Sequence, residues 1–475
     1  MQITNKHIYQ YKIETYDQKF FFDVNEQMEY LELRFSFNLQ GWQRVLVYDS
    51  QNNIRGQFLN YHSLKKLVFH PDISYCSTGV IAEKIYLGQW MIRVIDDEKI
   101  ASTLTMTVEF GSDLSNLTYY DQTIWFVDGN YTIPNKSIGN TGWYKGDLHT
   151  HTNSTDGNMS AEKLTDEAER LELDFFAITD HDFYHLKWPK TKLIVLPGVE
   201  ITAIQGHFNV IGLKKIIDWT PNKNDQGFNS NIGINRLFNE FHAQDAIVSI
   251  NHPFLDECMW TFNEVQLENV DAIEIINDPT YPDNLKANKK TIQFWTELLN
   301  EGYRITGIGG SDVHYYPTEY NLATTQTTEI GLPLTHLYME ACNKDNIVKS
   351  IANGMCYVTN GIDLEFNIKM NNETIIVGQR FTNNNTVYPI TYEVSVKGVP
   401  NVHIQFILNG ELIDYFVQEE TRVVFQIDIS SNKYHWLRCD IYDKEGLLLG
   451  FINPIYFGEK EITKKTWGEF LSNND

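Results

Sequence analysis

Cysteine is rare in this chain, and the few cysteines that occur are scattered. The five residues show no CxxC spacing and lie at positions 76, 258, 342, 356 and 439. An odd, dispersed set excludes a dense disulfide framework and is typical of free thiols in a reducing compartment. Long hydrophobic runs are also lacking, since no stretch approaches the roughly 20 apolar residues of a membrane helix. The polar segment Met1 to Thr15 has neither the basic start nor the apolar core of a signal peptide. We therefore expect a cytoplasmic protein that does not associate with membranes.

Positive charge is in short supply. The chain has 38 Lys and Arg residues against 62 Asp and Glu residues, a formal net charge of -24, and it has no basic run. This balance excludes nonspecific binding to nucleic acid, which needs a basic surface. A small-molecule substrate fits better, and an anionic phosphoester stays compatible because bound metal ions reverse the field locally. The sequence leaves the formation of a homo-oligomer open.

The chain is long enough for several domains. Its 475 residues, 42% hydrophobic and 13% aromatic, can bury substantial cores. Residues 1–135 and 362–475 carry apolar residues at every second position, for example at Leu31, Leu33 and Phe35 and again at Val402, Ile404 and Phe406. This period of two predicts β-sandwich-like domains on either side of a central domain, residues 143–361. The flanking domains could bind carbohydrate, cover the active-site mouth or mediate dimers, and their residues do not decide among these roles.

The central region alternates short apolar runs with helical patterns. The runs predict buried parallel strands over Phe175 to Ile178, Ile194 to Leu196, Ala246 to Ile250 and Ile305 to Ile308. Helical spacing behind the N-cap Ser160, and over Asn235 to Phe241 and Ile292 to Leu299, predicts crossover helices. Such alternation predicts an α/β domain with a parallel sheet, and in closed barrels the chemistry gathers where the strands end.

Two histidines separated by one residue are the clearest sign of a site. In the run Gly146-Asp147-Leu148-His149-Thr150-His151-Thr152, alternate positions at a strand end direct His149 and His151 toward one point. Such a pair also arises by chance in a chain with 14 histidines, so a metal site needs further ligands. Most candidates follow predicted strands, and they are Asp156, His181, Glu200, His252, Asp312 and His314. Carboxylates mixed with neutral imidazoles suit Zn²⁺, Mn²⁺ or Fe²⁺ better than Ca²⁺.

In this order the motifs resemble those of the PHP (polymerase and histidinol phosphatase) family of metallohydrolases, in its carbaryl-hydrolase-like branch, also labelled CehA/McbA. The resemblance spans residues 143–361. It rests on the HxH opening, Asp156-Gly157, Thr179-Asp180-His181, Pro197-Gly198-Val199-Glu200, Gly206-His207-Phe208-Asn209, Asn251-His252-Pro253 and Ser311-Asp312-Val313-His314. It implies a distorted (βα)7 barrel that holds two or three divalent ions, with zinc or manganese as the first choice and iron as the alternative.

The resemblance also implies how the ligands are shared among the ions. One ion would be bound by His149, His151, Glu200 and Asp312. Glu200 would bridge to a second ion that His252 also binds. A third ion would be bound by Asp156, His181 and His314.

His207 and Asp180 are the catalytic candidates. His207 is either a general acid or a further ligand, and Asn209 could fill that ligand position instead. Asp180 is either a carboxylate that orients His181, as Asp182 could also be, or a helix-capping or loop residue. Glu274 and Asn277, at the end of a further apolar run, are expected to face the same mouth.

These residues predict a metal-dependent hydrolase. Two ions about 3.5 to 4 Å apart can lower the pKa of a bridging water, so a bridging hydroxide would be the nucleophile. A small phosphoester is the first substrate class, and a carbamate, amide or ester is the alternative with the same centre. A phosphoesterase should place Arg or Lys beside the ions, whereas carbamate cleavage needs a roomier apolar pocket. A noncatalytic protein that metal ions stabilise is the second alternative.

Two long connections could shape access to this site. The polar stretch Lys214 to Asn231 could form a lid, and Tyr315 to Leu332 could line the substrate pocket. We expect these connections to set specificity.

Overall fold

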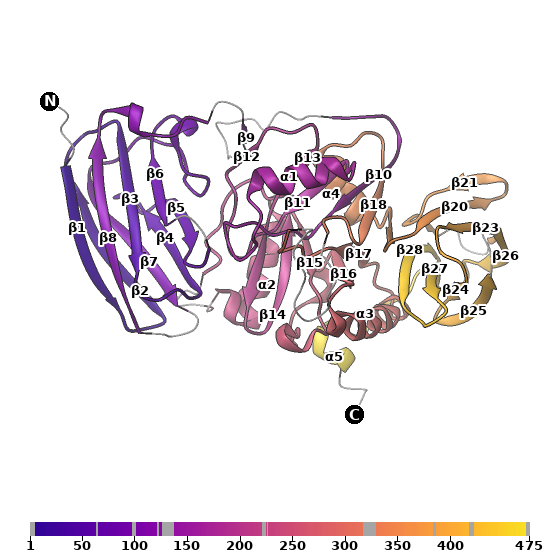
Figure 1. Cartoon of the computed structure of the whole chain (residues 1–475). Coiled ribbons are helices and arrows are strands. Elements are labelled where there is room, and N and C mark those ends of the chain that lie inside the picture. The colour runs from indigo at the N-terminus through magenta and orange to yellow at the C-terminus, as the bar shows by residue number, and fades with distance from the viewer. Residues whose placement is uncertain are drawn as a thin grey trace.

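The computed structural model describes residues 5–62, 65–96, 101–120, 123–125, 137–220, 225, 227–316, 329–382, 386–417 and 422–471. The protein is a mixed α/β molecule with far more strand than helix, and three parts follow one another along it in Figure 1. None of the described helices is both long and apolar enough to cross a membrane. None of the five cysteines, all of which lie within the described residues, forms a disulfide.

The amino-terminal part is a sandwich of two antiparallel sheets. Its strands are β1 (Asn5–Ile13), β2 (Asp17–Val24), β3 (Tyr30–Phe37), β4 (Gln43–Tyr48), β5 (Ile54–Leu59), β6 (Lys66–Phe69), β7 (Gly88–Asp96) and β8 (Ser102–Gly111). One sheet has the order β1-β8-β3-β6 and the other the order β2-β7-β4-β5. Phe22, Leu33, Val47 and Trp90 are buried in its core. Alternate residues are buried along β8, and Leu31, Leu33 and Phe35 of β3 are all buried, which explains the period-two pattern of the sequence.

Seven strands build the central part that carries the site. They are β10 (Gly142–Asp147), β11 (Phe175–Ile178), β13 (Ile194–Ala203), β14 (Gly206–Ile211), β15 (Ile247–Ile250), β16 (Ala272–Asn277) and β17 (Thr306–Gly310), and they neighbour one another in this order. The pairs are parallel except around β14, which runs antiparallel to both β13 and β15. The apolar runs that predicted strands are confirmed as β11, β13, β15 and β17.

This sheet curls until its first and last strands meet beyond their carboxyl ends. Thr150, just after β10, pairs in parallel with Val313, just after β17. The backbone N–H of Asp312 donates to the carbonyl of His149 at 2.9 Å. The backbone N–H of Ser311 donates to Oδ1 of Asp147 at 3.1 Å. The two ends of the sheet therefore bring candidate ligands to one place.

Helices are fewer than a regular barrel needs. The connections between these strands hold α1 (Ala161–Arg170), α2 (Asn231–His242) and α3 (Pro282–Glu301). Ser160 caps α1 as predicted, with Oγ accepting from the backbone N–H of Lys163 at 3.3 Å. No α-helix follows β11, β13 or β15 within the described connections, and β12 (Lys187–Pro189) pairs with β9 (Thr123–Trp125) instead. The specific (βα)7 barrel is therefore not confirmed, although a mixed α/β fold is.

Short turns of 3-10 helix complete the connections. They are η1 (Ile73–Tyr75), η2 (Leu114–Asn116), η3 (Gly227–Asn229), η4 (Asp256–Cys258) and η5 (Leu267–Asn269).

The central sheet continues into the carboxyl-terminal part. Here β18 (Leu334–Met339) pairs with β10, and α4 (Lys344–Ala352) leads to β19 (Cys356–Thr359). The remaining strands are β20 (Asp363–Met370), β21 (Glu373–Ile375), β22 (Arg380–Phe381), β23 (Val387–Lys397), β24 (Val402–Leu408), β25 (Glu411–Val417), β26 (Arg422–Ser430), β27 (His435–Asp443) and β28 (Leu448–Phe457). Because β19 pairs with β28, the strands β28-β27-β24-β25 extend the central sheet, while β21-β20-β23-β26 form a sheet of their own.

The last described helix returns to the central part. Trp467, in α5 (Trp467–Leu471), is fully buried, and its ring centroid lies 4.2 Å from that of Phe294 and 6.1 Å from that of Trp260. The backbone N–H of Gly468 donates to the carbonyl of Asn263 at 2.8 Å. These contacts favour grouping the chain end with the central part, and the predicted boundaries at 135, 143 and 361 stay a proposal.

The two connections predicted to control access fall partly outside the described residues, which leave out 221–224, 226 and 317–328. In the first connection, Lys214 to Asn231, the residues before the gap contact the amino-terminal sandwich. The Tyr48 hydroxyl donates to Oδ2 of Asp218 at 3.0 Å, and Nη1 of Arg93 donates to Oγ1 of Thr220 at 2.5 Å. Residues 218–220 are therefore fixed against the sandwich.

Candidate metal centre

The carboxyl ends of the central strands bring all the predicted metal ligands together. Asp156 lies in the loop between β10 and α1, Glu200 lies within β13, and the others directly follow β10, β11, β15 or β17. Groups whose ligand atoms lie within 4.8 Å of one another together include His149, His151, Asp156, His181, Glu200, His252, Asp312 and His314. Residues from distant parts of the chain thus form one compact cluster.

Glu200 is the hub of this cluster. Its side chain is fully buried, and its carboxylate oxygens lie 2.9 to 3.5 Å from ring nitrogens of His149, His151, His181 and His252. Nδ2 of Asn251 donates to Oε1 of Glu200 at 2.8 Å. A buried carboxylate among several imidazoles could hold a divalent metal ion together with them.

Asp312 faces the histidine pair from the opposite strand end. Its Oδ1 lies 2.9 Å from Nε2 of His151 and 3.3 Å from Nε2 of His149. Asp312 and His252 have φ angles of 52° and 26°, in a region that residues with a side chain rarely adopt. Backbone strain of this kind is concentrated at functional sites, where surrounding structure enforces the conformation.

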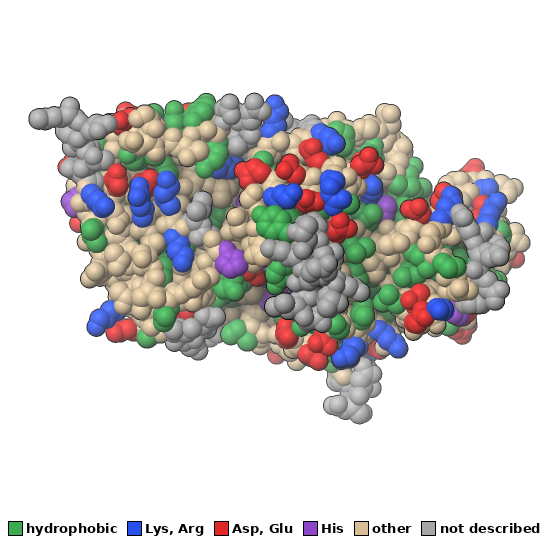
Figure 2. All heavy atoms as spheres, viewed as in Figure 1, with side chains coloured by type: hydrophobic (Ala, Val, Ile, Leu, Met, Phe, Trp, Pro, Cys, Tyr) green, Lys and Arg blue, Asp and Glu red, His purple; other side chains and the backbone are tan. Residues whose placement is uncertain are grey.

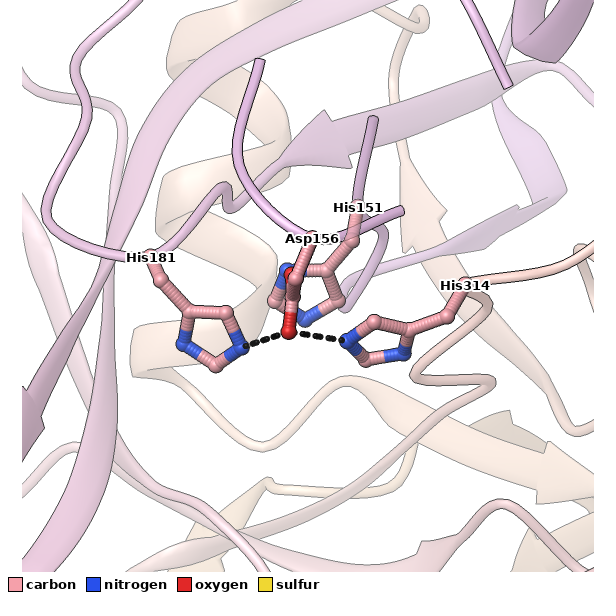
Figure 3. A group of neighbouring side chains, drawn as sticks. All are labelled: His151, Asp156, His181 and His314. Atoms are coloured by element: carbon pink, nitrogen blue, oxygen red, sulfur yellow. Dashed lines mark ion pairs between the residues drawn. The ribbon is translucent and has the colours of Figure 1, made fainter. Parts of the chain in front are cut away.

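A second group surrounds Asp156 (Figure 3). Oδ2 of Asp156 lies 3.5 Å from Nε2 of His181 and 3.4 Å from Nε2 of His314, from loops on either side of it. The ring of His151 packs against both other rings, with centroid distances of 4.4 Å to His181 and 4.2 Å to His314. His151 therefore lies between this group and the Glu200 group.

Several nitrogen and oxygen atoms at the centre of the cluster that could bind a metal ion are buried and have no hydrogen-bond partner. Nε2 of His149 and His151, Oε2 of Glu200 and Oδ1 of Asp312 are buried and make no hydrogen bond. Oδ1 of Asp312 nevertheless lies within 3.3 Å of both imidazole nitrogens, and Oε2 of Glu200 lies 3.5 Å from Nε2 of His151. Buried polar atoms normally have partners. Inward-facing nitrogen and carboxylate donors fit divalent transition-metal ions, which would satisfy all of these atoms at once.

Burial and neighbouring charges shift the pKa values of the side chains in the cluster. Burial alone would raise the pKa of Asp156, but the imidazoles of His181 and His314 hold it well below its usual range. Burial would lower the pKa of His314, but Asp156 raises it to about 9. His151 differs, because burial and then repulsion from His314 and His181 lower its pKa to about 4. A neutral His151 at pH 7 is in the form that binds metal.

Glu274 supports the cluster from β16. Its Oε1 lies 3.0 Å from Nδ1 of His149, the ring nitrogen that points away from Glu200. Its Oε2 accepts from the backbone N–H of His252 at 3.1 Å and from Nδ2 of Asn277 at 3.0 Å. A Cβ at Gly310 would collide with both His149 and Oε1 of Glu274, so this arrangement needs glycine there. The sequence placed Glu274 and Asn277 at the mouth without roles, and these contacts indicate that Glu274 orients His149.

Cys258, in η4, was missed by the sequence motifs. Its Sγ lies 3.3 Å from Nδ1 of His252, and it forms a group of closely spaced donor atoms with His207 and His252. No recognisable spacing could have found it, because the contact depends on the turn that follows β15.

His207 reaches the cluster, whereas Asn209 does not. Nδ1 of His207 lies 3.4 Å from Oε1 of Glu200, and its side chain keeps 16% of its surface exposed. Nδ2 of Asn209 donates to the carbonyl of Leu148 at 3.2 Å. Of the two residues that the motif left open, the geometry therefore favours His207 as ligand or general acid.

Asp180 and Asp182 do not orient His181. Oδ1 of Asp180 accepts from the backbone N–H of Thr152 and from Oγ1 of Thr155, both at 2.7 Å, and Oδ2 lies 2.5 Å from Nε2 of His185. Asp182 pairs with Arg44 of the sandwich at 2.7 Å. Nδ1 of His181 instead meets Oγ1 of Thr202 at 2.6 Å and Glu200 at 2.9 Å. The predicted catalytic role of Asp180 is thus not supported by its contacts, which are those of a residue that shapes the loop around Asp156.

Comparisons with known proteins give weak likenesses. No protein-family model and no curated protein matches this chain. Among solved structures, it is similar to a two-domain protein from Bacteroides vulgatus that contains a predicted PHP-like metal-dependent phosphoesterase. The two sequences are 18% identical, and the match covers 66% of this chain and 95% of that chain with a TM-score of 0.36.

Two further solved structures are similar to shorter portions of this chain. A protein from Bifidobacterium adolescentis, described as a metal-dependent phosphoesterase, shares 13% identity over 43% of this chain and 94% of its own, with a TM-score of 0.27. An amidohydrolase from Chromobacterium violaceum shares 13% identity over 39% of this chain and 91% of its own, with a TM-score of 0.24. Likenesses of this degree establish neither a family nor a function.

Proposed function

We propose that this protein is a metal-dependent hydrolase that acts on a small phosphoester. Two or three divalent ions, zinc or manganese before iron, would be held by the cluster around Glu200, Asp312 and Asp156. The observation that carries the proposal is the set of buried imidazole and carboxylate atoms that face one another without hydrogen bonds. Such a set is costly to bury unless it binds cations.

Bound divalent ions would make a water molecule more acidic and would stabilise negative charge on the substrate. The protein's own residues hold and tune the ligands. Glu274 fixes the orientation of His149 through Nδ1, and Glu200 joins the groups. Burial lowers the pKa of His207, so its imidazole is neutral near pH 7. A neutral, partly exposed imidazole at the edge of the cluster can take up and release a proton.

Turnover of two chromogenic substrates tests the proposal. The full-length protein, loaded with manganese or zinc, would be assayed with p-nitrophenyl phosphate and 1-naphthyl methylcarbamate, beside the variants His149→Ala and Asp312→Ala. We expect the parent to hydrolyse the phosphate, both variants to lose that activity, and His403→Ala, in the carboxyl-terminal sheet, to keep it. If neither site variant loses activity that the parent shows, the proposed centre is wrong.

A carbamate, amide or ester hydrolase is the second candidate. Among the described residues, no Lys or Arg forms an ion pair with any of the cluster's carboxylates, and Arg44, which contacts the loop after β11, is paired with Asp182. Phosphate oxygens are commonly met by such cations. Turnover of the carbamate without turnover of the phosphate would favour this candidate over the first.

A further inference from the structure

The amino-terminal sandwich reaches the metal centre. Trp42 lies just before β4, and Tyr61 follows the neighbouring strand β5, so both lie at the same end of this strand pair. The Trp42 ring centroid lies 5.2 Å from that of His181, edge to face at 68°, and 5.6 Å from that of Tyr61. A residue of the amino-terminal sandwich thus touches a candidate ligand of the central part.

Polar contacts hold this part of the sandwich in place beside the cluster. Nη2 of Arg44 donates to the carbonyl of Thr202 at 2.8 Å, and the same guanidinium pairs with buried Asp182 at 2.7 Å. Just after β5, the backbone N–H of His62 donates to the carbonyl of Thr155 at 3.0 Å. These contacts grip the loops that carry His181 and Asp156, so the two aromatic rings have a fixed position relative to the site.

The rings also have free surface next to the open edge of the site. Trp42 and Tyr61 are half-buried, and the side chains of Asp156 and His314 keep 21% and 22% of their surface exposed. Tyr315 is 41% exposed, with its ring centroid 6.3 Å from that of His314. Partly exposed aromatic rings therefore lie beside both histidines of the Asp156 group, Trp42 beside His181 and Tyr315 beside His314.

The indole nitrogen of Trp42 does not by itself indicate a ligand. Its indole Nε1 is buried and makes no hydrogen bond. The indole N–H groups of Trp260 and Trp467 in the core are in the same state. The position of the Trp42 ring is therefore set by its contacts with His181 and Tyr61, and its exposed ring surface is the part that a bound molecule could touch.

We propose that the amino-terminal sandwich supplies one wall of the substrate pocket, in which Trp42 and Tyr61 select substrates that carry a flat ring beside the group held by the ions. The proposal rests on the proposed function, which leaves the organic part of the substrate open. Aromatic faces attract other rings through stacked or edge-to-face contacts. The wall is therefore a specificity-determining surface and takes no part in the chemical step.

Binding of two phosphonates that are not hydrolysed tests the proposal without depending on turnover. Calorimetry with the manganese-loaded full-length protein would compare phenylphosphonate with methylphosphonate, which differ only in the ring. We expect the parent to bind phenylphosphonate roughly tenfold more tightly, because ring contacts of this kind are worth about a factor of ten in affinity. Trp42→Ala should lose most of this preference, and Trp42→Phe should keep part of it.

Phe21→Ala is the matched control, because Phe21 is 50% exposed and lies in β2, at the opposite edge of the same sheet. It should keep the full preference. Equal affinities in the parent, binding of neither compound, or an unchanged preference in Trp42→Ala would overturn the proposal. Loss of manganese from Trp42→Ala, measured by elemental analysis, would also overturn it, since Trp42 would then only support His181. Failure of the proposed function is distinct, because it would show as absent turnover of p-nitrophenyl phosphate.

Discussion

At the scale of single residues, the cluster depends on side chains that support its ligands. Glu274 contacts Nδ1 of His149 and the backbone N–H of His252, so one carboxylate holds two candidate ligands. Such supporting partners fix the tautomer and the orientation of an imidazole that binds metal through its other nitrogen.

Removing this charge should weaken metal binding. We expect Glu274→Gln to lower metal affinity about 10- to 100-fold, because the neutral amide keeps only one of the two acceptor oxygens that meet His149 and the N–H of His252. Competition with a fluorescent chelator would measure the affinity for zinc or manganese. Glu297→Gln, an exposed position on α3, is the control and should bind metal as the parent does. Equal affinity in parent and Glu274→Gln would contradict the role of Glu274.

Asp180 should matter for stability more than for catalysis. Its oxygens accept from Thr152 and Thr155, and an amide in Asp180→Asn would leave at least one of these buried groups badly paired, at a cost of about 1–3 kcal/mol. Urea unfolding would measure this loss. At saturating metal we expect kcat to stay within about threefold of the parent, whereas loss of a general acid or base costs about 10²- to 10⁴-fold. A loss of kcat in the second range without a loss of stability would restore Asp180 as a catalytic residue.

The clustering of the candidate ligands could be predicted from the sequence because most of them stand in short motifs at the ends of apolar runs. The partners of those residues could not. Glu274 and His149 are 125 positions apart, and the roles of Asp180 and Asp182 depend on Thr155 and on Arg44 of another part of the chain. Adjacency to His181 in sequence suggested a contact that the three-dimensional arrangement does not make.

At the scale of elements, an ion pair at the end of α2, away from the candidate metal centre, should make the stability of the protein depend on pH. His242, the last residue of α2, lies with Nε2 2.8 Å from Oδ2 of Asp271, directly before β16. This hydrogen bond raises the pKa of His242 above its usual value. A protonated imidazole there also suits the negative end of the helix.

The stabilisation by this pair should depend on pH. Because the folded-state pKa is raised, the contribution should be fully present below the unfolded pKa of about 6.5 and should be lost as the pH rises through the folded-state pKa. We expect His242→Gln to lower the free energy of unfolding by roughly 0.5–1 kcal/mol near pH 6 and by much less near pH 9. Urea unfolding of both proteins at the two pH values would measure this. An equal difference at both would contradict the assignment.

Strands with continuous apolar runs could be predicted, and so could the cap of α1, because both depend on local sequence. The shape of the barrel could not. The reversal at β14 follows from the tight β13–β14 hairpin, where Gly206 adopts a φ of 128° and the chain returns directly instead of through a helix. The resemblance implied a (βα)7 barrel, in which a helix follows each strand.

At the scale of the whole molecule, the three parts are tied to one another by the chain end and by the sandwich contacts. The helix α5 lies below α3 in Figure 1, and its Trp467 packs against Phe294 of α3. Figure 2 shows side chains of both charge signs spread over the visible face instead of one basic surface, in keeping with the net charge of -24.

Removal of the Trp467 ring should destabilise the central part. We expect Trp467→Ala to lower the free energy of unfolding by about 3–5 kcal/mol, the usual cost of deleting a buried aromatic side chain. Leu412→Ala, at a 55% exposed position, should change it by less than about 0.5 kcal/mol. Urea unfolding followed by circular dichroism would measure both. A Trp467→Ala variant as stable as Leu412→Ala would show that the chain end is only loosely attached.

The organisation into β-rich ends and an α/β centre could be predicted from the change of hydrophobic period along the chain. Contacts between the parts could not, since Trp42 and Trp467 carry no signal beyond being aromatic. Their importance follows only from where the fold places them.

Anomalous diffraction from crystals of the manganese- or zinc-loaded protein tests the central claim most directly. The account predicts at least two strong peaks, one between His149, Glu200 and Asp312 and another within reach of Glu200 and His252, with a third beside Asp156 when that position is filled. Peaks only elsewhere, or no peak in a fully reconstituted sample, would contradict it.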